Sequence, residues 1–241
     1  MFSRRHSTRL VVFSLLMAAS ATALAGLFSV TPVRIFMTPR DRAVAITLTN
    51  EGDADVALQA DIHAWTQSSQ GEDQLALTED MILSPPIIKL APRARQVVRL
   101  ALLRAPDASR QLTYRLIVRE VPEATLPKDN TMEVPIALAL SMPVFITPPA
   151  ARHGVNCEVL RSGPGLQALC SNSGTAYAQV REISLKRNDA VVARFQGGQY
   201  LLPGTRRPMA LTAEQPVAAG DAQMTVVFDD GKSQAFNVRL P

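Results

Sequence analysis

The side chains that could do chemistry are few, and none of them forms a catalytic arrangement. The three histidines, His6, His63 and His153, are far apart in the sequence. Asp229 and Asp230 are adjacent, so on a strand they point to opposite faces and cannot act as a carboxylate pair. The chain has no G-x-S-x-G motif and no complete P-loop. The sequence therefore predicts a protein that is not an enzyme and that uses no cofactor or metal.

The two cysteines, Cys157 and Cys170, are separated by 13 positions. In an oxidising compartment a pair this close is typical of a local disulfide. A redox-active or metal-binding pair is the alternative, but the C-x-x-C spacing typical of such sites is missing. We expect a Cys157–Cys170 disulfide.

The stretch from Val134 to Ile146 alternates between large and small side chains. Successive side chains of a strand point to opposite faces, so one face carries a continuous row of large apolar groups. Two interpretations are open: a core strand buried on both faces, or an edge strand whose row fills a groove in another protein. The large residues of the row are Val134, Ile136, Leu138, Leu140, Met142 and Val144.

The elements that position these residues are short alternating runs, and no stretch has the spacing of a long amphipathic helix. Seven strands are expected in each half of the chain, which fits an all-β protein of two immunoglobulin-like β-sandwich domains. In the first half, Thr66 to Asp80 is expected to be a polar loop, and Met132 to Ile146 the longest strand. A proline-rich joint at 147–151 separates the halves.

The N-terminus has the features of a secretory signal peptide, with a basic start, an apolar run over 10–17 and Ala23-Leu24-Ala25 as the cleavage site. The domains expected are residues 1–25 as signal peptide, 26–147 and 148–241. Removal of the signal peptide takes away three of the 25 basic residues and none of the 21 acidic ones, leaving a charge near zero. A near-neutral protein argues against nucleic-acid binding, and no later segment is long enough to span a membrane.

Several short motifs in the same order resemble the periplasmic pilus-assembly chaperones of the chaperone–usher pathway, across essentially the whole mature chain. The motifs are Val33-Arg34-Ile35-Phe36, Leu48-Thr49-Asn50, Ala64-Trp65, the segments 85–92, 96–100 and 114–122, Asn172-Ser173-Gly174 and Leu201-Leu202-Pro203-Gly204. The resemblance implies two immunoglobulin-like domains in an L or boomerang arrangement. The form of residues 141–145 and the position of Arg115 resemble the archaic branch, which serves spore-coat-U-like pilins.

The resemblance also implies how the protein works. The last strand of the first domain is donated to a pilin that lacks its own final strand. By position the donor residues are Val134, Ile136 and Leu138, with Leu140 and Met142 extending the row. The loaded pilin then passes to an outer-membrane usher. An uncovered donor strand also predicts self-association of the unloaded protein.

The family further anchors the pilin's C-terminal carboxylate with two basic residues between the domains. Arg34 falls on the first position, whereas Pro143 stands where a lysine is usual. Arg115 is the proposed second anchor, with Arg99 as an alternative; a guanidinium suits this role because its geometry matches a carboxylate. The competing function, a secreted adhesin or carbohydrate-binding module, is disfavoured by a single tryptophan and three tyrosines.

Overall fold

The computed structural model describes residues 28–105, 107–122, 136–188 and 190–241. Every regular element among them is a strand, which confirms the all-β prediction. The same residues contain no helix suited to crossing a membrane. The predicted signal peptide and Val134 lie outside the described residues.

The first half forms a sandwich of two sheets. One sheet has the order β1-β3-β8-β6, and the other has the order β2-β10-β9-β4-β5, with β7 also paired to β4. Their strands are β1 (Phe28–Thr31), β2 (Ile35–Met37), β3 (Ala43–Asn50), β4 (Val56–Gln67), β5 (Asp73–Leu77), β6 (Met81–Ser84), β7 (Ile87–Leu90), β8 (Arg95–Leu102), β9 (Leu112–Glu120) and β10 (Ala139–Ile146).

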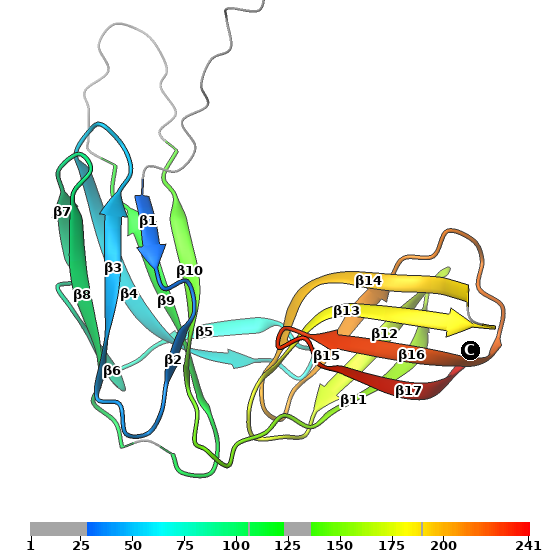
Figure 1. Cartoon of the computed structure of the whole chain (residues 1–241). Coiled ribbons are helices and arrows are strands. Elements are labelled where there is room, and N and C mark those ends of the chain that lie inside the picture. The colour runs from blue at the N-terminus through cyan, green and yellow to red at the C-terminus, as the bar shows by residue number, and fades with distance from the viewer. Residues whose placement is uncertain (1–27, 106, 123–135, 189) are drawn as a thin grey trace, which may run out of the picture.

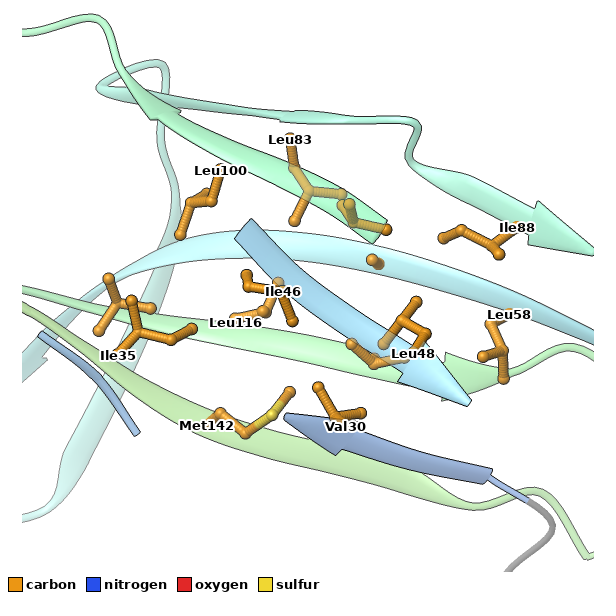
Figure 2. Packing of buried hydrophobic residues seen from close by; sticks show 14 of the residues in the cluster. Val30, Ile35, Ile46, Leu48, Leu58, Leu83, Ile88, Leu100, Leu116 and Met142 are labelled. Atoms are coloured by element: carbon orange, nitrogen blue, oxygen red, sulfur yellow. The ribbon is translucent and has the colours of Figure 1, made fainter. Parts of the chain in front are cut away.

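The core between these sheets follows directly from the alternation in the sequence. Ile46 and Leu48 of β3 are buried while the intervening threonine is partly exposed, as period-two side-chain placement requires. Leu116 of β9 and Met142 of β10 face them from the other sheet, and Figure 2 shows these side chains in the space between the strands. Burial of this apolar surface is what holds the two sheets together.

Three expectations about the first half are wrong, and the first is the number of strands: ten, β1 to β10, are present among the described residues where seven were expected. The region 66–80, expected to be a loop, contains the end of β4 and all of β5, because residues 73–77 pair along the end of β4. The last strand was expected over 132–146, of which 132–135 lie outside the described residues. Residues 136–138 are not in a strand, β10 begins at Ala139, and β4 with 12 residues is longer. All of β5 is exposed, so no burial pattern in the sequence could have revealed it.

The second half has the seven strands expected, in a three-stranded sheet β11-β12-β15 and a four-stranded sheet β14-β13-β16-β17. They are β11 (Val155–Ser162), β12 (Gly165–Asn172), β13 (Ala178–Arg187), β14 (Ala190–Leu201), β15 (Arg206–Leu211), β16 (Gly220–Phe228) and β17 (Ser233–Leu240). Cys157 and Cys170 lie directly opposite each other on β11 and β12 and form the expected disulfide, inside the core of this sandwich.

A buried asparagine at the end of a strand fixes an adjoining turn in each half. Asn50 donates to three backbone carbonyl oxygens and accepts from the backbone N–H of Gly52. Asn172 donates to two carbonyl oxygens and accepts from the N–H groups of Gly154 and Gly174. Buried backbone polar groups need such partners, so both side chains are structural.

The two sandwiches lie as the arms of an L, joined by the chain between β10 and β11 (Figure 1). The predicted boundary at 147/148 falls in this connection and stays a prediction. In Figure 1 the end of β4 and all of β5 extend from the first sandwich towards the second. The inner corner of the L is therefore built from residues of both arms.

Candidate functional site

Strand β10 has an open edge over most of its length. It pairs with β9 from Ala139 to Ile146, but with β2 only over Val144–Ile146. Among the described residues no strand pairs with the outer side of residues 139–143. Unpaired backbone groups at a sheet edge can accept a strand from another protein.

The row of large side chains on β10 runs from exposed to buried. Ile136, just before the strand, is 91% exposed, while Leu138 and Leu140 are half-buried against the core. Met142 is 4% exposed and packs inside the domain's own core (Figure 2). Of the predicted donor residues, Met142 is thus already covered in the unloaded chain, and the apolar face open to a partner comprises Ile136, Leu138 and Leu140.

The opposite face of β10 contributes to the corner between the two arms. Phe145 is fully buried and stacks on Tyr177 of the second domain, with ring centroids 4.0 Å apart and planes 9° from parallel. Trp65 of β4 and Tyr200 of β14 add further aromatic contacts, and Leu202 packs against these rings. We call these five residues the corner cluster.

Two glutamines of the first domain bind the backbone of the second at the same corner. Gln67 donates to the carbonyl oxygen of Tyr200 at 2.9 Å and accepts from the N–H of Leu202 at 3.0 Å. Gln111 accepts from the N–H of Tyr177 at 2.8 Å. The corner cluster and these hydrogen bonds together define how the arms are joined.

Strand register brings Arg34 and Arg115 to the two sides of Pro143. Pro143 pairs with Arg115 of β9, while Val144 pairs with Ile35, the residue that follows Arg34. Arg34, the residue just before β2, and Arg115 of β9 therefore lie on the two sides of β10, on the side of the sheet that faces the corner cluster. Arg99 lies exposed on β8 of the other sheet and cannot join them.

The surroundings of the two arginines differ. The Arg34 side chain is 32% exposed, and its Nη1 lies 2.7 Å from Oδ2 of Asp229 in the second domain. Arg115 is 14% exposed and stacks on the Trp65 ring, 3.8 Å from its centroid, with Nη2 4.0 Å from Oδ2 of Asp73. Burial lowers the pKa of the Arg115 guanidinium, partly offset by Asp73. Both groups still carry donors that suit a carboxylate.

The aspartates beside these arginines were not recognised in the sequence. Asp229 contacts Arg34, whereas its neighbour Asp230 pairs with Lys232 at 2.8 Å. Asp73 lies in the segment expected to be a loop. No local sequence signal could have found either pairing, since Arg34 and Asp229 are 195 positions apart.

A cavity of about 540 Å³ also opens at the junction of the arms. Its lining includes Trp65, Asp80, Arg104, Arg110 and Thr205, but neither Arg34 nor Arg115. The residues described contain no group of three or more histidines, cysteines or acids placed to hold a metal ion.

Comparison with known proteins identifies the family. The model of pili and flagellar-assembly chaperones, PapD N-terminal domain, matches residues 27–152, more than half of the 241 residues. The chain belongs to this family of pilus-assembly chaperones. This assignment sets aside the adhesin or carbohydrate-binding alternative and matches the resemblance seen in the sequence motifs.

Individual relatives agree with the family assignment. The chaperone is 27% identical over 206 residues to the probable fimbrial chaperone YfcS of Escherichia coli (strain K12), covering 78% of this chain and 76% of the relative. Its fold resembles a chain of the CsuC–CsuE chaperone–tip adhesion subunit pre-assembly complex from the archaic chaperone-usher Csu pili of Acinetobacter baumannii. There the TM-score is 0.65 at 19% identity, with 88% of this chain and 98% of that chain covered.

A second structural likeness is to a chain of the complex between SafA pilin and SafB chaperone of Salmonella enterica. The TM-score is 0.60 at 15% identity, with 91% of this chaperone and 99% of that chain covered. At these identities the likenesses establish the fold: two immunoglobulin-like sandwiches.

Proposed function

We propose that this chaperone binds pilin subunits in the periplasm by donating β10 to them and passes them to an outer-membrane usher without chemistry of its own. The observation that carries the proposal is the open edge of β10 with Ile136, Leu138 and Leu140 beside it. Structures of related fold include complexes of a chaperone with a pilin and with a tip adhesion subunit. The sequence motifs and the Csu likeness support a place in the archaic branch.

The energetics favour such a complex. A strand added at β10 gains main-chain hydrogen bonds that set its register. Full burial of an apolar side chain of this size stabilises by about 1.5–3 kcal/mol. Ile136 contributes most to the gain because it is 91% exposed in the unloaded chain, whereas Leu138 and Leu140 are already half-buried.

Arg34 and Arg115 are the proposed anchors of the subunit's C-terminal carboxylate. Both lie beside β10, at the end of the strand that meets the corner cluster. A strand that pairs along β10 and ends at this corner would bring its terminal carboxylate to the two guanidinium groups. Charge-assisted hydrogen bonds would then fix the register from that end.

Co-expression with a candidate pilin, followed by purification and size-exclusion chromatography, tests the donor strand. We expect Ile136→Glu to abolish a one-to-one complex, because it places a charge in the subunit's apolar groove. The variant leaves the chaperone's own fold intact, since Ile136 is almost fully exposed. Val97→Glu, an exposed apolar residue on the other sheet, is the matched control and should bind normally.

A second pair of variants tests whether Arg34 anchors the subunit's C-terminal carboxylate. Arg34→Ala should weaken the complex, whereas Arg99→Ala removes an equivalent charge from the opposite sheet and should not. A complex that survives Ile136→Glu would refute donation of β10. A complex that survives Arg34→Ala would refute the carboxylate anchor.

A further inference from the structure

Each proposed anchor arginine already faces an aspartate in the unloaded chaperone, and the Arg34 contact is the closer of the two. Arg34 Nη1 lies 2.7 Å from Asp229 Oδ2, and the hydroxyl of Tyr177 donates to the same oxygen at 3.3 Å. Asp229 is the less exposed partner, with 15% of its side chain accessible against 32% for Arg34. The acid comes from the second domain and the base from the first.

Asp229 is held firmly by its own domain. It follows the last residue of β16, and its backbone N–H donates to the carbonyl oxygen of Gln179 at 3.1 Å. The turn that follows is closed by the N–H of Gly231, which donates to the carbonyl oxygen of Phe228 at 3.1 Å. The carboxylate is therefore presented to Arg34 by a fixed turn.

Contacts other than the ion pair also hold the arms together. The corner cluster and the hydrogen bonds of Gln67 and Gln111 join the same two domains through separate contacts. An ion pair of this exposure adds little to stability on its own. Arg34 and Asp229 can thus separate while the corner stays closed.

A second carboxylate at Arg34 would have to compete with Asp229. Two negative charges that share one guanidinium repel each other, so the site favours one occupant at a time. The incoming carboxylate replaces a contact that already satisfies Arg34, and its net gain is correspondingly small. When that carboxylate leaves, Asp229 can re-form its ion pair with Arg34 and neutralise the charge of the guanidinium.

We infer that Asp229 is an internal carboxylate that occupies Arg34 in the unloaded chaperone and is displaced by the C-terminal carboxylate of the subunit. This inference rests on the proposed function, because it presumes that Arg34 receives that carboxylate. Its consequence is weaker capture but easier release: the ion pair re-forms as the subunit departs, so Arg34 is not left unpaired.

Binding of a synthetic peptide tests the inference. The peptide is the C-terminal strand of the pilin that forms a complex with the chaperone on co-expression, made with either a free carboxylate or an amidated end. Asp229→Asn keeps the shape of the side chain and removes its charge. Asp230→Asn is the matched control, because Asp230 lies in the same turn but pairs with Lys232. The fluorescence of Trp65, the only tryptophan, reports binding at the corner.

We expect Asp229→Asn to bind the free-acid peptide about two- to fivefold more tightly than the wild type. This is the decrease in dissociation constant expected when a competing ion pair of this exposure is removed. The amidated peptide should bind both proteins equally, and Asp230→Asn should match the wild type. Equal or weaker binding of the free acid by Asp229→Asn would overturn the inference, and weaker binding would mean that Asp229 positions Arg34 for its ligand.

The structure of the chaperone–pilin complex gives a second readout that does not depend on the peptide. The subunit's carboxylate should lie within hydrogen-bond distance of Arg34, with Asp229 no longer in contact. An Arg34–Asp229 pair that persists beside a bound carboxylate would overturn the inference alone. A complex that survives Arg34→Ala, or no complex at all, would overturn the proposed anchor or function and the inference with it.

Discussion

Replacement of Phe145 by alanine should uncouple the two arms of the chaperone. Phe145 is fully buried and contacts aromatic rings from both domains: Phe36 and Trp65 from the first, Tyr177 and Tyr200 from the second. It is the member of the corner cluster that faces the most aromatic partners. Its removal leaves a cavity at the junction and withdraws packing from both sides at once.

The expected cost follows from this burial. Truncation of a buried phenylalanine to alanine destabilises by about 3–5 kcal/mol, and stacked aromatic pairs add about 0.5–1.5 kcal/mol beyond area burial. The 4.0 Å stack on Tyr177 places Phe145 towards the upper end of that range. At an m-value of about 2 kcal/mol/M, the urea midpoint of the corner should fall by about 2 M.

Urea unfolding followed by two signals separates the corner from the domains. Trp65 fluorescence reports the corner, where its ring lies 6.0 Å from that of Phe145, while far-UV circular dichroism reports both sandwiches. In Phe145→Ala the fluorescence change should come at lower urea than the dichroism change. Val144→Ala is the control, because Val144 is equally buried but points into the core of the first domain. Coincident transitions in Phe145→Ala, shifted no further than in Val144→Ala, would refute the reasoning.

Two further predictions concern buried polar groups. Burial raises the pKa of all three tyrosines, Tyr114, Tyr177 and Tyr200, above the ordinary 10.0, so the native state keeps phenolic protons that the unfolded state loses. Stability should therefore fall as the pH rises above 10, and tyrosinate absorbance should appear together with loss of circular dichroism; free titration of the native protein near pH 10 would contradict this. Asn50→Ala and Asn172→Ala should each destabilise one domain by roughly 2 kcal/mol or more, because each substitution leaves buried backbone groups without hydrogen-bond partners. A shift in urea midpoint no larger than that of an ordinary surface substitution would show that water replaces these hydrogen bonds.

Much of the fold could be predicted from the sequence because side-chain alternation is a local property. The strand over 112–120 was located to the residue, and all seven strands of the second half were anticipated. The disulfide was predictable for a similar reason, since its two cysteines are close in the chain and lie opposite each other in one hairpin. The strand β5 was missed because its five residues are exposed and lack the pattern that burial imposes.

The candidate site was predictable only in part. The row of large apolar side chains on β10 could be predicted from the alternation in the sequence. Where this row changes from exposed at Ile136 to buried at Met142 depends on how far β2 and the opposite sheet extend beside β10. Arg34 and Arg115 were named by resemblance. Their positions on either side of Pro143 follow from the pairing of three strands that are not consecutive in the sequence.

The sequence by itself determined which faces of the strands are apolar, where the disulfide forms and which family the motifs resemble. These properties depend on residue types and short spacings, which the chain carries locally. Only the tertiary structure decided that Asp229 meets Arg34, that Arg115 stacks on Trp65, and that Phe145 joins two tyrosines across the corner. The reason is physical: these contacts depend on the register of distant strands and on the angle between two sandwiches, and neither is a property of any one segment.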